Sequence, residues 1–159
     1  MRDLGRESSV LKVFAWIALG SQTADNNLMP VTIHIWDEVV PGPRSPAKLV
    51  TVPKAETTAR ELIGRRVREE VERYNQSLSE VFCGLVQPEE SERILNGFRM
   101  RVKRPLDWEV QVQRACSSFE GNGFLLIVDG RQATSLDERI ELRADSEVQF
   151  VKLVPLVGG

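Results

Sequence analysis

The sequence contains few of the residues from which catalytic and metal sites are usually built. Its 159 residues include one histidine, His34, and two cysteines, Cys83 and Cys116. A triad with a histidine base or a metal site with several histidines is therefore not expected, and His34 is expected to be exposed or structural. The cysteines belong to no CxxC pair. We expect both to be buried small hydrophobic residues in a protein of the reducing cytosol, although a disulfide between them stays open.

Strong charge of one sign and a membrane-spanning apolar run are also missing from the sequence. The 21 basic and 23 acidic residues give a formal net charge of −2, which supplies no field to attract nucleic acid or an anionic membrane. The apolar stretch 10–20 is too short to cross a bilayer as a helix, and it resembles a signal peptide only faintly. We expect a weakly ordered extension over 1–28 and one domain over 29–159, with neither nucleic acid nor membrane as a partner.

Motifs of enzymes are missing as well. Glu69 and Glu70 are adjacent carboxylates, but neighbours on a helix do not share a face, so paired acid–base chemistry is not expected of them. The glycines at 121 and 123 precede an expected strand, which is the reverse of the strand-to-helix context of a phosphate loop. We expect a protein that is not an enzyme and has no catalytic residue, metal ligand or cofactor of its own.

Apolar periodicity predicts an α+β fold. Alternating residues predict strands near 31–36 and 48–52, which a loop rich in proline and glycine separates. Thr58 and Glu61 have the spacing of a capping box, which predicts a helix over 58–74. Its apolar stripe would pack across a sheet, and its charged residues are expected on a solvated side: Arg65, Arg66, Arg68, Glu69, Glu70, Glu72 and Arg73.

The final 36 residues carry the most specific pattern in the chain. A β-rich run, a glycine turn, a short strand, two polar turns, a last strand and a diglycine follow one another. The β-rich run is Phe124–Val128, the glycine turn is Asp129-Gly130, the two later strands are 131–133 and 147–154, and the diglycine is Gly158-Gly159. In this order of elements and turns, the sequence resembles the C-terminal half of ubiquitin-like β-grasp proteins. The resemblance implies a mixed sheet with a helix across it.

The resemblance also implies that Gly158 and Gly159 form the reactive end of a protein modifier. A carboxylate becomes an acyl donor when ATP converts it to an adenylate, and glycine lets the chain enter a narrow enzyme site. Gly159 would be adenylated by an activating enzyme, pass to a cysteine of that enzyme or of a conjugating enzyme, and be joined to a lysine of a target protein. Deconjugating enzymes are further expected partners.

Two alternatives stay open at this point. The tail before the diglycine is apolar and contains proline, which looks closer to prokaryotic sulfur carriers, whose terminus receives sulfur as a thiocarboxylate. A β-grasp interaction domain whose terminus is never activated is the other alternative. We favour the modifier, because sulfur carriers are usually compact and this chain nearly doubles the minimal fold.

The segment 76–123 departs from the family pattern and is interpreted as an insertion. Strands are expected at Val81–Val86 and Phe98–Val102, with a turn at Asn96-Gly97. Asp107 is expected to cap a second helix that ends near Gly121. One apolar stripe is expected on this helix: Trp108, Val112, Ala115 and Phe119.

A surface for partners is expected beside the tail. Alternation in the last strand directs Val148 and Phe150 inward and Gln149 and Val151 outward, with Leu153 continuing the outer row. An apolar outer row favours contact with a partner, unless the insertion covers it. The residues expected to bind a partner are Val151, Leu153, Pro155, Leu156 and Val157.

Overall fold

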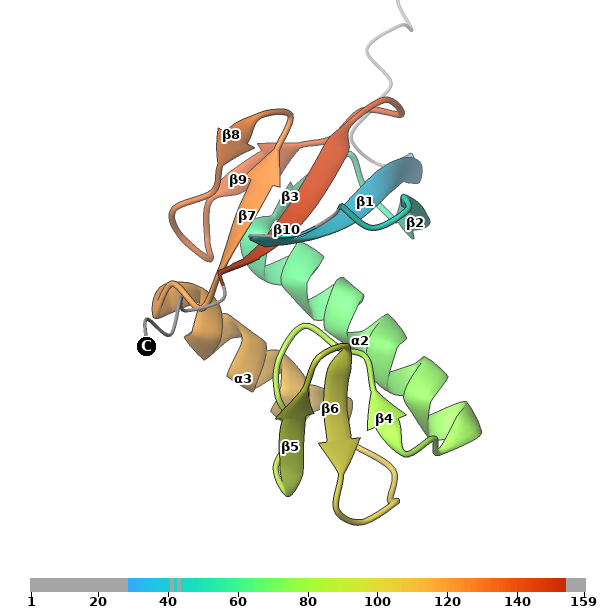
Figure 1. The fold of residues 1–159 in the computed structure, drawn as a ribbon. Coiled ribbons are helices and arrows are strands. Elements are labelled where there is room, and N and C mark those ends of the chain that lie inside the picture. The colour runs from blue at the N-terminus through green and yellow to red at the C-terminus, as the bar shows by residue number, and fades with distance from the viewer. Residues whose placement is uncertain (1–28, 41, 43, 154–159) are drawn as a thin grey trace, which may run out of the picture.

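The computed structural model describes residues 29–40, 42 and 44–153, and the predicted α+β class is confirmed over this part of the chain. It contains two helices and three sheets. Figure 1 shows a large sheet at one end of the molecule, a smaller one at the other end, and helix α2 running from one to the other. No helix in the described ranges is long and apolar enough to cross a membrane.

The main sheet has five strands in the order β2-β1-β10-β7-β8. The central pair, β1 and β10, is parallel, and all other pairs are antiparallel. The strands lie close to their predicted positions: β1 Val31–Val40, β2 Lys48–Val52, β7 Phe124–Val128, β8 Arg131–Gln132 and β10 Glu147–Leu153. Asp129 and Gly130 both have positive φ, at 48° and 77°, as the predicted tight hairpin turn requires.

Strand β1 is longer than its sequence pattern predicts. The expected strand near 31–36 continues to Val40, because β10 pairs with it along the whole of that length, from His34 opposite Glu147 to Val40 opposite Leu153. The acidic residues Asp37 and Glu38 interrupt the apolar alternation, so the second half of the strand gives no pattern in the sequence.

Helix α2, Ala59–Ser77, covers one face of the main sheet (Figure 1). The predicted capping box is present: the Glu61 amide donates to Thr58 Oγ1 at 3.2 Å, and the Thr58 amide donates to Glu61 Oε2 at 3.0 Å. The core between helix and sheet includes Ile63 and Val67 from α2 and Phe150 from β10. This confirms the predicted inward direction of the apolar stripe.

The expectation that all charged residues of α2 face solvent is wrong at two positions. Arg66 is 5% exposed and Glu70 is 4% exposed. Both follow the apolar stripe at helical spacing, Arg66 three residues after Ile63 and Glu70 three residues after Val67. They therefore lie where α2 leaves the main sheet and meets the inserted segment.

The segment 76–123, interpreted above as an insertion, contains a second sheet, which we call the small sheet, with strand order β4-β6-β5. Its strands are β4 Val81–Phe82, β5 Ser91–Ile94 and β6 Gly97–Met100. The strand expected at Val81–Val86 ends at Phe82, the one expected at Phe98–Val102 ends at Met100, and β5 is a third strand. The predicted hairpin turn is present but lies one residue earlier, at Leu95 and Asn96, because Ile94 pairs with Gly97. Gly97 begins β6 and has a φ of 141°, which favours glycine. Two short strands elsewhere, β3 Glu56–Thr58 and β9 Arg139–Glu141, form a separate ladder.

Helix α3, Trp108–Glu120, lies beside α2 and is capped by Asp107 as predicted. It buries Ala115 and Phe119, but Trp108 is 38% exposed and does not belong to the buried stripe. The Arg68 guanidinium lies over the Trp108 ring, 4.9 Å from its centroid, so this indole covers the surface of α2 instead.

The two cysteines differ in environment. Cys116 on α3 is buried, as expected, and burial raises the pKa of its thiol. Cys83 is exposed, contrary to expectation, because it follows the two-residue strand β4 directly and lies outside the core. Both thiols are free, so no disulfide links them. The single histidine, His34, is exposed on β1.

Candidate functional site

The strand that leads to the diglycine is held at the centre of the main sheet. Strand β10 pairs with β1 on one side and β7 on the other, and Val148 and Phe150 are completely buried. The described part of the chain ends at Leu153, so the predicted partner-binding residues Pro155, Leu156 and Val157 and the reactive glycines Gly158 and Gly159 lie outside it.

The expected exposure of Val151 is wrong. Its side chain is on the face opposite Phe150, as alternation predicts, but it is only 6% exposed. The sheet register places Glu38 of β1 and Leu125 of β7 directly beside it, and both side chains are longer than that of valine. Val151 is therefore a buried residue of a central strand, and a partner cannot reach it without a change in the sheet.

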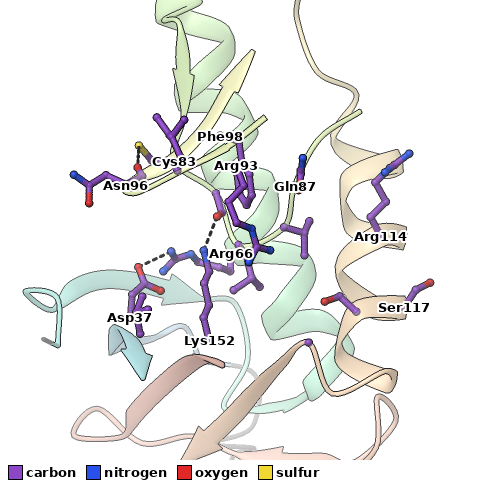
Figure 2. A pocket seen from close by; sticks show the side chains of 18 of the residues that line it. Asp37, Arg66, Cys83, Gln87, Arg93, Asn96, Phe98, Arg114, Ser117 and Lys152 are labelled. Carbon is purple, nitrogen blue, oxygen red and sulfur yellow. Dashed lines mark hydrogen bonds and ion pairs between the residues drawn. The ribbon is translucent and has the colours of Figure 1, made fainter. Parts of the chain in front are cut away.

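A cleft with a volume of about 1040 Å³ opens beside the end of β10, on the face that carries Lys152. It lies between the main sheet, the small sheet and α3 (Figure 2). The main sheet contributes Asp37, Lys48 and Lys152, the small sheet contributes Arg93 and Phe98, and further lining comes from the loop 83–87 and from α3. The cleft thus forms at the junction of the inserted segment with the tail strand.

A buried charge network supports the wall of this cleft. Arg66 Nη2 donates to Asp37 Oδ2 at 2.7 Å, and Arg66 Nε donates to Glu70 Oε1 at 2.6 Å. Glu70 Oε2 accepts a hydrogen bond from the Leu85 amide at 2.8 Å, which fixes the loop below β4. The network therefore links strand β1, helix α2 and the insertion, three segments distant in the sequence.

The titration of these groups follows from their burial and pairing. Burial acts to raise the pKa of Asp37, but Arg66 and Lys48 outweigh it and hold that pKa below its usual value. Burial raises the pKa of Glu70, and the attraction of Arg66 offsets only part of this effect. Burial acts to lower the pKa of Arg66, whereas Glu70 and Asp37 raise it, so the guanidinium stays charged.

Lys152, unlike Arg66, is not paired with a carboxylate in the described part of the chain. Its Nζ donates to the Gly84 carbonyl oxygen at 2.7 Å, and it has no carboxylate within ion-pair distance in the described ranges. Burial lowers the pKa of its ammonium group, and the carboxylates of Glu70 and Asp37 offset part of that effect. Lys152 is thus a half-buried cation whose hydrogen bond within the described residues is to a backbone carbonyl.

Compared with protein-family models, with curated proteins and with solved structures, the chain gives no match. Its function has to be argued from its own residues. Among the residues described, no group of three or more His, Cys, Asp and Glu side chains is placed to hold a metal ion. The arrangement consists of a tail strand at the centre of a sheet and a cleft with several cations beside that strand.

The sequence interpretation missed this cleft, although it contained some signals. Arg66 and Glu70 adjoin the apolar stripe of α2 at intervals of three residues, which is a detectable pattern. Lys152 follows the buried Phe150 by two residues, so alternation alone places it on the inner face. The contribution of Arg93 gave no signal, because it depends on how the insertion folds back on the sheet.

Proposed function

We propose that this chain is a ubiquitin-like protein with a β-grasp fold that acts as a protein modifier. The observation that carries the proposal is the position of β10: a central strand, parallel to the first strand, leads directly into the diglycine tail. The helix α2 across the sheet and the two-residue turn between β7 and β8 also fit this fold. The small sheet and α3 are then an insertion between α2 and β7.

In this function the reacting atom belongs to Gly159, and the catalytic groups belong to other proteins. An activating enzyme joins the Gly159 carboxylate to the adenylyl group of ATP and releases pyrophosphate. A cysteine thiolate of that enzyme, or of a conjugating enzyme, then displaces AMP to form a thioester. The amine of a target lysine finally displaces the thiol to form an isopeptide bond, which a deconjugating enzyme hydrolyses. The cytosol, which supplies ATP and keeps thiols reduced, is the proposed location.

The folded domain presents the tail to these enzymes. The pairing of β10 on both sides fixes the direction in which the chain leaves the sheet after Leu153. Pro155 lacks an amide donor, which keeps the tail from adding to a sheet. With Val151 buried, the apolar contact with an activating enzyme falls to Leu153, Pro155, Leu156 and Val157.

The test compares two N-terminally tagged copies in the native host, the wild-type chain and a chain that lacks only Gly159. The modifier predicts heavier tagged species in the wild type and none with the truncated chain. A tagged monomer in which sulfur replaces one oxygen would instead establish a sulfur carrier. A wild-type chain whose terminus stays unmodified would instead support the interaction domain.

A further inference from the structure

The cleft beside β10 has more positive than negative charge. Five cations line it: Lys48, Arg66, Arg93, Arg114 and Lys152. The neighbouring carboxylates are Asp37 on its wall, Glu70 behind it, and Glu89, which pairs with Arg114. Asp37 and Glu70 are engaged by Arg66 and Lys48. The cluster therefore has an excess of two positive charges.

The excess lies on Lys152 and Arg93. Lys152 bonds only to the Gly84 carbonyl, and Arg93 has no ion pair within the part of the chain that the structure describes. Their cationic groups both approach the ring of Phe98, each 5.9 Å from its centroid. Figure 2 shows Lys152 rising from the main sheet and Arg93 extending from the small sheet toward the same space.

Two further observations indicate that this space favours an anion. Burial is the largest cause of the lowered pKa of Lys152, and the charges of Arg66 and then Arg93 lower it further, because these cations repel Lys152. In addition, Arg66 is buried and lines the cleft, but its Nη1 group has no hydrogen-bond partner in the described residues. A half-buried cation such as Lys152 and a buried donor without a partner are costly unless an anion or a polar group satisfies them, whereas Arg93 is exposed.

We propose that the cleft is a binding site for an organic phosphate monoester, with the phosphate held by Lys152 and Arg93. A phosphate monoester carries a charge of about −1.5 to −2 at pH 7, which matches the excess on the cleft. Arginine binds phosphate through paired donors and lysine binds it as a point charge. An inorganic phosphate would leave most of the 1040 Å³ empty. The organic part of the ligand lies along the aliphatic side chains of Val86, Ile94 and Val110.

The test uses phenyl phosphate, inorganic phosphate and phenol as probes, with the full chain at low ionic strength and calorimetric titration. Wild-type protein is expected to bind phenyl phosphate more tightly than either of the other probes. Arg93→Met and Lys152→Met are each expected to weaken binding about tenfold or more, since a charge-assisted hydrogen bond contributes about 1.5–3 kcal/mol. Lys152→Arg retains the charge and is expected to bind within a few-fold of wild type.

The matched control is Arg131→Met on β8, a cation that is 77% exposed and lies on an edge strand of the main sheet outside the cleft. Its expected affinity is within about twofold of wild type, because an exposed charge at a distance is screened. Three results would overturn the proposal: no binding of phenyl phosphate at millimolar concentration, equal losses in Arg131→Met and Arg93→Met, or binding of phenol as tight as that of phenyl phosphate. Inorganic phosphate that binds as tightly as phenyl phosphate would contradict the role of the aliphatic wall.

Discussion

At the scale of single residues, Arg66 joins the two halves of the molecule. Substitution Arg66→Met leaves Glu70 buried without its cation, and we expect a loss of about 3–5 kcal/mol in the free energy of unfolding. The matched control is Arg68→Met on the same helix, whose ion pair with Glu72 is exposed and is expected to contribute under about 1 kcal/mol. Urea denaturation monitored by circular dichroism measures both.

The double variant Arg66→Met, Glu70→Gln separates charge pairing from packing. It removes both buried charges and keeps an acceptor for the Leu85 amide, so it is expected to recover much of the stability that Arg66→Met alone loses. A double variant as unstable as the single one would show that the uncompensated charge of Glu70 is not the cause of the loss. Equal effects of Arg66→Met and Arg68→Met would contradict the buried network itself.

Lys152 is expected to give the protein a measurable dependence of stability on alkaline pH. Its pKa is lower in the folded protein than in the unfolded chain, so the unfolded chain binds more protons between those two pKa values. The contribution of Lys152 to the free energy of unfolding therefore rises as the pH increases from its folded pKa toward about 10.4, the usual pKa of lysine. The Lys152→Met variant removes this contribution.

The measurement is the difference in unfolding free energy between wild type and Lys152→Met at a series of pH values from neutral to alkaline. The difference is expected to change in favour of the wild type as the pH rises. Taking a difference cancels the titration of groups common to both proteins, such as Tyr74, whose pKa burial raises. A difference that stays constant over the range would mean that Lys152 is fully solvated in the folded protein.

At the scale of elements, the N-terminus of α2 depends on its capping box. Thr58→Ala leaves the Glu61 amide without its partner, and we expect a loss of about 1 kcal/mol in unfolding free energy. Thr58→Ser keeps the hydroxyl oxygen in place and is expected to lose much less. Thermal and urea denaturation of the two variants check this, and equal losses would point to the methyl group of Thr58 rather than to the cap.

Local sequence signals determined which elements could be predicted. The capping residues Thr58 and Asp107 and the turn glycines Gly97 and Gly130 each act within a few residues, so the helices and hairpins beside them were predicted. The length of β1 was not predictable, because its second half is a strand only through pairing with β10, more than 100 residues later.

At the scale of the whole molecule, the cleft results from contacts between segments that are distant in the sequence. Arg93 and Lys152 approach the same ring only because the insertion folds back over the end of β10. Apolar patterns record burial against a core, but they do not record which charged residues meet across elements. The burial of Val151 also depends on residues distant in the sequence, because the sheet register places its neighbours from β1 and β7 beside it.

The most direct test of the proposed modifier uses its own sequence. Trypsin cleaves after Lys152, so digestion of a conjugate leaves the seven residues Leu153–Gly159 attached through Gly159 to the side chain of a target lysine. Tandem mass spectrometry of digested material from the native host is expected to find lysines that carry this branch, and to find none when Gly159 is deleted. Recovery of Leu153–Gly159 only as a free peptide with an ordinary carboxylate, from cells in which the protein is active, would contradict conjugation.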